Sequence, residues 1–292
     1  MNQSKNSRIR LIAVGDILLG RGVGTMIKRN GPDYPLKAVS TVLKTGDITI
    51  ANLECPATKK GRPVTKPITF NSDPQSLGAL KKAGISMVSL SNNHALDYGR
   101  TGLLETMKYL RQHNIPFFGA GHNAYEAHRP LIIQKNGLKI AFFSYNAHPY
   151  EGVAYDQKRA NIALARKKSV IHHDIGLIRK KVDLVIVCFH WGREFRPLPT
   201  ALQRTLARIT IDAGADLIIG HHPHVLQPPR YYRGKLILFS LGNFVFDQTD
   251  PKQTESVIFS CDLSSKGVSN VKFTPVRIHN CQPRLATNSG LS

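Results

Sequence analysis

The sequence predicts a layered α/β fold, and three of its features support that class. Apolar runs of about 5–7 residues, rich in β-branched residues and without polar alternation, recur along the chain, as is typical of strands covered on both faces. Helical stretches lie between them, and several end in glycine, a common helix stop. The 292 residues are also enough to bury one large core. Strand–helix alternation of this kind predicts helices packed on a sheet.

Seven runs are predicted as strands, and each ends at or next to a side chain that can bind metal or form hydrogen bonds. In chain order they are RLIAVGD (10–16), DITIANLE (47–54), ISMVSLSNNH (85–94), KIAFFSYNAH (139–148), DLVIVCFHWG (183–192), DLIIGHHPH (216–224) and KLILFSLGN (235–243). The predicted helices are 35–46, 73–84, 99–113, the basic stretch 166–181, and 199–214.

The strand ends are the predicted location of the site, because ligands in such folds bind outside the carboxyl ends of the strands. A lone buried histidine is usually a core residue with satisfied hydrogen bonds. Repetition of the pattern across the chain instead favours one shared site, to which distant segments contribute.

Six side chains form a predicted metal site with a mixed oxygen and nitrogen donor set: Asp16, Glu54, Asn93, His190, His222 and His224. Such a set without thiolate suits one or two divalent ions such as Mn²⁺, Zn²⁺ or Fe²⁺. In the stretch HHPH, an extended chain would turn His222 and His224 to one side and His221 away. The other interpretation is a hydrated loop that is rich in imidazole.

Six motifs, taken in order, resemble the bacterial capsule-synthesis CapA family, which is associated with poly-γ-glutamate synthesis. They are GDILLGR, ANLE, SLSNNHALDYG, FHWGREF, GADLIIGHHPHVLQP and FSLGNFVF, and the resemblance runs from about Arg8 to Pro283. That family in turn resembles the calcineurin-like metallophosphoesterases. The resemblance implies a four-layer αββα sandwich, with a single domain over 8–283 and flexible termini at 1–7 and 284–292.

The resemblance also implies roles for individual positions. Asp16 matches the first metal-binding aspartate of the metallophosphoesterases, and Glu54 stands where they have a bridging aspartate. The remaining matches are the Asn-His pair at Asn93 and His94 and the later histidines His190, His222 and His224. The opening Asp-x-His motif is absent because Leu18 occupies the histidine position, and Arg21 would supply fixed positive charge there. The number of ions therefore stays open between one and two.

The implied chemistry is hydrolysis by a metal-activated water. His94 would donate a proton to the leaving group, and Asp97 would orient its imidazole. Asp97 has an equally good alternative as the cap of a helix beginning near Tyr98.

Four further positions are predicted to contact an anionic substrate. Lys66, Arg193 and Glu194 are expected on loops beside the site, with solvated surface charge as the alternative. Asn243 is expected to form a hydrogen bond at the rim, unless Gly242 and Asn243 simply make a turn.

The charge balance favours an anionic partner. Forty Lys and Arg residues against nineteen Asp and Glu residues give a net charge of +21, although surplus lysine can also serve solubility alone. Two classes of function remain: a metal-dependent hydrolase acting on a phosphoester or on polyglutamate amides, and a non-catalytic polyanion-binding accessory of polyglutamate synthesis. No specific nucleic-acid motif is present.

The cellular location is predicted as cytoplasmic. The first ten residues are polar, and the apolar run after them is far shorter than the roughly 20 residues of a membrane span. The four cysteines are widely spaced without a CxxC pair, which predicts reduced thiols.

Overall fold

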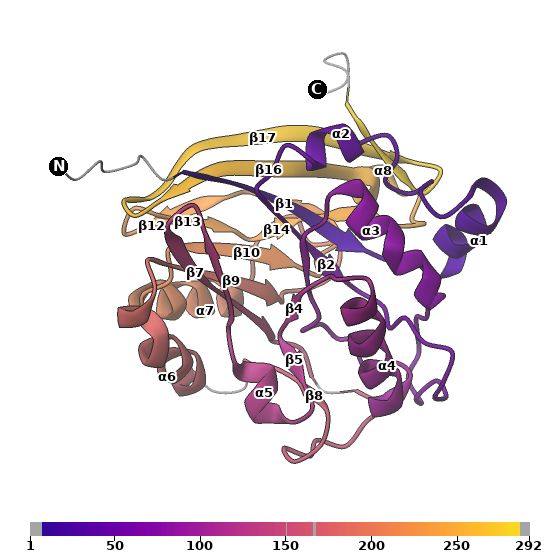
Figure 1. Ribbon diagram of the computed structural model, residues 1–292, viewed down its shortest axis with the longest axis horizontal. Helices are drawn as coiled ribbons and strands as arrows, with labels where there is room; N and C mark the ends of the chain where they lie inside the picture. Colours follow the sequence, from indigo (N-terminus) through magenta and orange to yellow (C-terminus); the bar gives the residue numbers. More distant parts are fainter. Residues whose placement is uncertain (1–7, 150, 166–167, 287–292) are drawn as a thin grey trace.

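Two large sheets organise the computed structural model, which describes residues 8–149, 151–165 and 168–286 (Figure 1). The first sheet has eight strands, in the order β18 (Gln282–Leu285), β17 (Gly267–His279), β16 (Glu255–Ser264), β1 (Ile9–Ile17), β2 (Ile48–Leu53), β3 (Met87–Ser89) and β4 (Phe117–Phe118), with β15 (Asn243–Val245) paired to β1.

The second sheet has six strands, in the order β12 (Arg230–Tyr232), β13 (Lys235–Leu238), β10 (Leu217–His221), β9 (Leu184–His190), β7 (Leu138–Asn146) and β6 (Leu131–Lys135). Two short pairs complete the strands: β11 (Leu226–Gln227) with β14 (Ser240–Leu241), and β5 (Ala120–Gly121) with β8 (Asn161–Ile162).

The helices cover the outer faces of the two sheets. On the first sheet lie α1 (Arg21–Asn30), α2 (Ser40–Leu43), α3 (Leu77–Ala83) and α4 (Gly99–Gln112), and on the second lie α6 (Lys168–Ile178) and α7 (Ala201–Asp212) (Figure 1). The remaining helical segments are α5 (Ala124–His128), α8 (Pro251–Thr254) and the 3-10 turns Pro74–Ser76 and Arg179–Lys181.

Three apolar cores separate these four layers. Along β1, Leu11 belongs to the core between the sheets, whereas Ile12 belongs to the core shared with the helices. On the second sheet, Ile186 faces the core between the sheets and Val187 faces the core that includes Leu206 of α7. This arrangement explains the continuous apolar runs of the sequence, and it confirms the predicted αββα sandwich.

The central strands of each sheet run parallel, so their carboxyl ends meet at one edge of the sandwich. β1, β2, β3 and β4 pair in parallel in the first sheet, as do β7, β9, β10 and β13 in the second. The register places Asn52 beside Asp16, and it places Asn146 and His221 on either side of His190.

Some local predictions were wrong. The helix expected at 35–46 is reduced to α2 after a series of turns, and helix α1 was not predicted because its start is rich in glycine. The antiparallel strands β16, β17 and β18 were also missed. The expected domain end at Pro283 is too early, because Arg284 and Leu285 still pair with β17. Residues 1–7, 287–292 and the start of the predicted helix at 166–181 lie outside the described residues.

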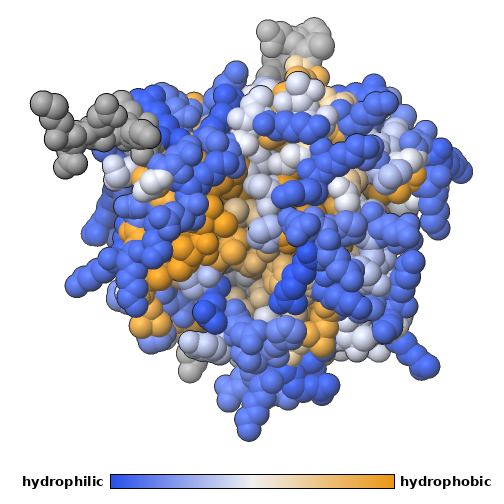
Figure 2. Space-filling model, in the orientation of Figure 1, coloured by the Kyte–Doolittle hydropathy of each residue, from blue (hydrophilic) through white to orange (hydrophobic). Residues whose placement is uncertain are grey.

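The surface agrees with a strongly charged chain. On the face shown in Figure 2, hydrophilic residues cover most of the area, and a hydrophobic area lies near β7 and β9. Among the described helices, none is long and apolar enough to cross a lipid bilayer.

Candidate metal centre

Asp16 lies at the end of β1 and is fully buried. Its Oδ1 accepts a hydrogen bond from the side-chain amide of Asn52 at 2.8 Å, and its Oδ2 accepts one from the backbone N–H of His222 at 3.1 Å. The preceding Gly15 allows this approach, because a Cβ there would lie 2.0 Å from the carbonyl oxygen of Gly242. Glycine therefore lets the strands close around the carboxylate.

Glu54 directly follows β2 and is also fully buried. Neither of its carboxylate oxygens has a hydrogen-bond partner. Two imidazole nitrogens lie near it: Nε2 of His190, 3.3 Å from Oε1, and Nε2 of His224, 3.7 Å from Oε1. Burial, followed by the nearby charge of Asp16, raises the pKa of Glu54 well above its ordinary value. A buried carboxylate without donors is costly unless a cation faces it.

The second sheet contributes His190, the last residue of β9. Its Nε2 lies 2.8 Å from Oδ1 of Asn93 and 3.1 Å from Nδ1 of His222. These atoms come from a loop after β3, a strand end and a loop after β10. The structure therefore brings together donors that the sequence separates by more than a hundred residues.

His222 and His224 reach the site from a turn and not from an extended segment. Their φ angles are 95° and 57°, in the left-handed region, so the alternation expected for HPH was wrong. The turn is fixed by the contact of His222 with Asp16 and by a hydrogen bond from the Phe195 N–H to the Pro223 carbonyl, at 2.8 Å. His221 points away and lies 3.2 Å from the carbonyl oxygen of Val14, as predicted.

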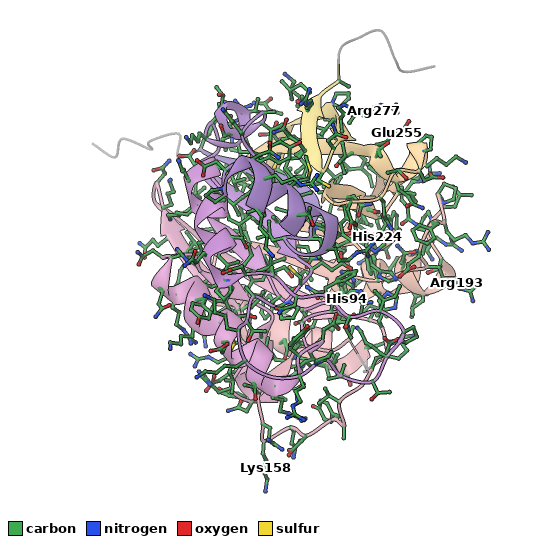
Figure 3. All side chains as sticks on the ribbon, turned by 90° about the vertical axis from the view of Figure 1, so that its right-hand side faces the viewer. His94, Lys158, Arg193, His224, Glu255 and Arg277 are labelled. Carbon is green, nitrogen blue, oxygen red and sulfur yellow. The ribbon has the colours of Figure 1, made fainter. Side chains whose placement is uncertain are left out.

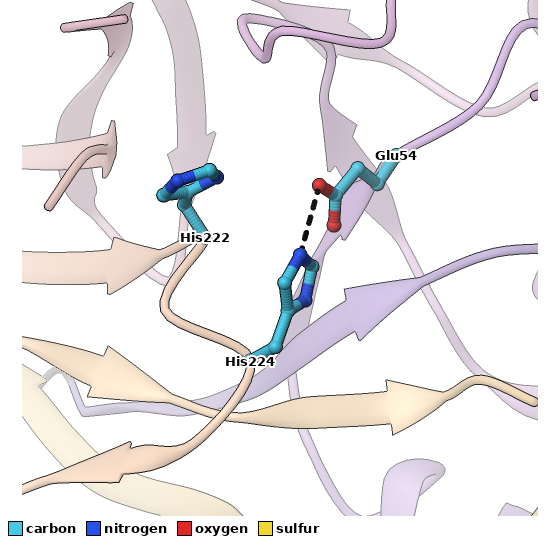
Figure 4. Close-up of side chains that lie close together, drawn as sticks. All are labelled: Glu54, His222 and His224. Atoms are coloured by element: carbon cyan, nitrogen blue, oxygen red, sulfur yellow. Dashed lines mark ion pairs between the residues drawn. The ribbon is translucent and has the colours of Figure 1, made fainter. Parts of the chain in front are cut away.

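Asn243 supports His224 from behind. Its Oδ1 lies 2.8 Å from Nδ1 of His224, which leaves Nε2 of His224 facing Glu54 (Figure 4). Asn243 is fully buried, and its amide also donates to the Gln253 carbonyl at 3.0 Å. The expected position at the substrate rim was therefore wrong, and the hydrogen bond fixes the orientation of the imidazole.

These residues fit a divalent cation. Two sets, Asp16–Glu54–His190 and Glu54–His222–His224, each offer three ligand atoms within 4.8 Å of one another, and Glu54 belongs to both. Burial lowers the pKa of His224 to about 4 and those of His190 and His222 well below the ordinary value. Neutral imidazoles beside buried carboxylates are the form that metal binding requires.

Metal affinity should rise with pH between about 5 and about 7. Burial raises the pKa of Asp16 from 3.8 to about 7, so metal binding below that pH must displace its proton. His224, with a pKa of about 4, is already neutral and does not compete. We expect up to about a tenfold gain per pH unit for each proton displaced. Calorimetric titration with Mn²⁺ or Zn²⁺ at about pH 5 and about pH 7 measures this change in affinity. An affinity that stays constant between the two pH values would contradict the assignment of Asp16 as a ligand.

A second cluster, His94–Asp97–Lys66, lies beside the ligands. Nδ1 of His94 is 2.7 Å from Oδ2 of Asp97, and the ring stacks on Phe70 with centroids 3.8 Å apart. The same Asp97 oxygen accepts a hydrogen bond from the Phe70 N–H at 2.6 Å. The N-cap residue of α4 is Tyr98 and not Asp97, and no side chain caps this helix. Asp97 therefore orients His94, and the alternative role as a helix cap was wrong.

Lys66 belongs to this cluster and not to the surface. Only 4% of its side chain is exposed, and its Nζ lies 2.5 Å from Oδ1 of Asp97 and 2.9 Å from the Asn93 carbonyl oxygen. The alternative of a solvated surface charge was therefore wrong, and contact of Lys66 with substrate stays a prediction. Lys66 instead neutralises Asp97 and ties it to the loop that carries Asn93.

The remaining predicted residues lie farther out. Nε of Arg21 is 3.2 Å from Oδ2 of Asp247, and its guanidinium lies over the Phe70 ring at 5.3 Å from the centroid. Arg193 and Glu194 are exposed on the loop after β9, and Figure 3 shows Arg193 at the surface, beyond His224 and His94. Leu18 is fully buried, so the position of the missing histidine is filled by an apolar side chain.

Two neighbours of the site were given no role from the sequence. Asn52 donates to Asp16, and its amide nitrogen also lies 3.3 Å from Nδ1 of His190. His148 follows β7, and its ring centroid lies 3.6 Å from that of His222. The sequence does place His148 at the end of one of the seven predicted strands, but no role was predicted for it.

Comparison with known proteins connects this centre to one family. The family described as "Bacterial capsule synthesis protein PGA_cap" matches residues 10–248. The PGA biosynthesis protein CapA of Bacillus subtilis is 34% identical over 92% of this chain and 72% of that protein. The capsule biosynthesis protein CapA of Bacillus anthracis is 32% identical over 98% of this chain and 71% of that protein.

Solved structures with this fold share little sequence. A putative 5'-nucleotidase from Staphylococcus aureus superposes with a TM-score of 0.59 at 14% identity, covering 97% of this chain and 55% of that one. The NAD nucleotidase of Haemophilus influenzae gives 0.58 at 12% identity, covering 97% and 59%. The chain thus shares the fold of these two nucleotidase structures.

Proposed function

The chain belongs to the bacterial capsule synthesis protein family, and from that premise we propose that it is a metal-dependent hydrolase of an anionic substrate. The substrate class is a phosphoester or the amide links of a polyglutamate chain. The observation that carries the proposal is Glu54, whose two buried oxygens lack any hydrogen-bond donor while neutral imidazoles face it. A divalent cation shared among these groups would supply the positive charge that the buried oxygens lack.

Asp16, Glu54, Asn93, His190, His222 and His224 would hold the ion or ions. Bound divalent ions would supply Lewis acidity and lower the pKa of a water molecule. The protein's own contribution is a set of buried, fixed donors, since five of these six residues are buried and Asn93 is half-buried. Fixed, desolvated charges favour a transition state in which negative charge develops.

His94 would transfer a proton in the proposed reaction. Because its Nδ1 faces Asp97, its Nε2 is the nitrogen left to meet a leaving group. Burial lowers the pKa of His94, while the hydrogen bond and charge of Asp97 raise it. An anionic substrate would raise the pKa of His94 further, so a larger fraction of His94 would be protonated when substrate binds.

A turnover screen tests the proposal. Protein stripped with chelator and protein reconstituted with Mn²⁺, Zn²⁺ or Fe²⁺ would be compared on phosphomonoesters, phosphodiesters and poly-γ-glutamate. Hydrolysis that depends on the ion supports the proposal. Bound ion without hydrolysis of any of these substrates would leave only the second candidate function.

The second candidate is a non-catalytic, polyanion-binding accessory of polyglutamate synthesis. Leu18 favours it, because the position of a metal-binding histidine is filled by an apolar side chain. The net charge of +21 favours it as well. A relative from Mycobacterium tuberculosis, 29% identical over 69% of this chain and 56% of that protein, is named a probable polyglutamine synthesis accessory protein.

Polymer binding should depend on exposed arginines near the site. Replacing Arg193 and Arg196 with alanine should weaken poly-γ-glutamate binding and reduce its salt dependence. The reason is that salt weakens charge–charge attraction between exposed groups, since the Debye length falls to about 8 Å at physiological salt. The matched control replaces the exposed Lys139 and Lys266, which lie elsewhere. Binding measured across a salt series should separate the two variants. Equal losses would show that only the overall charge matters.

A further inference from the structure

A groove opens beside the core between the two sheets, where β16 and β17 carry that core towards the surface. Val257 and Phe259 of β16 belong to the core between the sheets, and their cross-strand partners on β17 are Pro275 and Phe273. Residues directly opposite one another in a strand pair lie on the same face. Phe273 therefore continues the inner face of the first sheet, yet it is 39% exposed, so this face leaves the core at β17.

The groove has a volume of about 650 Å³, and its walls are largely apolar. On one side lie β17 and β18, where Leu285 is 45% exposed. On the other side lie Leu226, Leu238 and Leu241, from β11, β13 and β14. None of the six predicted metal ligands lines the groove. Its size and composition are typical of small-molecule sites, which measure about 300–1,000 Å³.

Three charged side chains form one cross-strand row at this groove. The register places Arg277 of β17 opposite Glu255 of β16 and opposite Arg284 of β18. Nη2 of Arg277 donates to Oε1 of Glu255 at 3.1 Å, and Figure 3 shows these two residues close together. Nε of Arg284 donates to Oε1 of Gln282, a neutral group, at 3.0 Å.

One carboxylate in this row thus faces two guanidinium groups. Like charges directly opposite one another destabilise a strand pair, and Glu255 can balance only one of the two arginines. An anion beside Arg284 would remove this repulsion, and a guanidinium suits a carboxylate in particular. The row therefore favours a ligand with a negative charge.

An apolar groove beside an unbalanced guanidinium matches a molecule that has an apolar body and one anionic group. We propose that this groove binds a free long-chain carboxylate, with its hydrocarbon chain against Phe273 and Leu285 and its carboxylate at Arg284. The bounded cavity favours such a molecule over a second protein, which needs a contact surface of about 800 Å² on each side. The site is separate from the candidate metal centre and does not depend on the proposed function.

The test is calorimetric binding of dodecanoate, kept below its micelle-forming concentration, with dodecanol and butyrate for comparison. We expect one dodecanoate per chain. Dodecanol, which lacks the charge, should bind about tenfold more weakly or less well still. Butyrate should not bind measurably, because each buried methylene group contributes to affinity. Protein stripped of metal should give the same result, which separates this site from the metal centre.

Two variants with matched controls locate the head group and the chain. Arg284→Gln should lower dodecanoate affinity about tenfold and leave dodecanol affinity unchanged. Its control is Arg29→Gln, at an exposed arginine of α1 outside the groove. Leu285→Ser should weaken binding of both probes, whereas Leu202→Ser, at an exposed leucine of α7, should weaken neither.

Several results would overturn the proposal. Folded wild-type protein that binds no dodecanoate would do so, as would equal losses from Arg284→Gln and Arg29→Gln, which would reduce binding to general charge attraction. Binding that appears only in a chain ending at Ala286 would make residues 287–292 the occupant. A dimer of the wild type in light scattering that Leu285→Ser dissociates would make the occupant a second copy. If Leu285→Ser fails to fold, the comparison of Arg284→Gln with Arg29→Gln decides.

Discussion

Glu54→Gln should reduce the affinity for a divalent ion by more than about 100-fold, a larger effect than loss of a residue that only orients a ligand. Glu54 is the residue shared by both three-ligand sets, and an amide lacks the charge that offsets a dication. The metal-free variant should nevertheless melt no lower than the metal-free wild type, because the carboxylate it replaces forms no hydrogen bond. Elemental analysis and thermal melts after chelation measure the two effects.

Glu105→Gln is the matched control for that variant. Glu105 is also buried, but its Oε2 accepts hydrogen bonds from the Thr58 hydroxyl at 2.6 Å and from the Lys60 N–H at 3.0 Å. Its replacement should keep the ion and lower the free energy of unfolding by about 1–3 kcal/mol. If Glu54→Gln keeps the ion and loses stability in the same way, Glu54 is a structural residue.

His94→Ala should lower turnover by about 10²–10⁴-fold while the protein keeps its ion. The reason is the position of His94, which neighbours Asn93 and is held by Asp97 without belonging to either three-ligand set. Steady-state rates and metal content, measured on the same preparation with the substrate found by the turnover screen, separate acid catalysis from ligation.

His128→Ala provides the control for this second variant. Nδ1 of His128 lies 2.8 Å from Oδ2 of Asp174, a pair similar to His94–Asp97 that belongs to neither three-ligand set. Its loss should leave turnover per folded molecule unchanged. Metal loss in His94→Ala would make His94 a ligand, and full turnover would remove it from the mechanism.

The residues of the site that lie at the ends of parallel strands could be predicted from the sequence. Asp16, Glu54 and His190 each close an apolar run, and parallel strands bring such ends to one edge. The layered core was predictable for the same reason, since the runs are apolar on both faces. Short antiparallel strands such as β18, which starts at Gln282, carry no comparable signal.

The predictions failed where tertiary contacts decide the conformation. His222 and His224 adopt positive φ because the turn is held by Asp16 and by the Phe195 N–H, neither of which is near in sequence. For Lys66 the alternative of a solvated surface charge failed, because its partner Asp97, thirty-one residues away in the sequence, pairs with it in a buried position. Local pattern cannot show such partners, so the sequence located the site more reliably than it assigned the residues around it.

The most direct test of the account is the metal content of the purified wild-type protein after reconstitution, measured by elemental analysis. The geometry of Asp16, Glu54, His190, His222 and His224 predicts one or two equivalents of Mn, Zn or Fe per chain. Folded protein that holds no divalent ion after exposure to each of these metals would contradict the account.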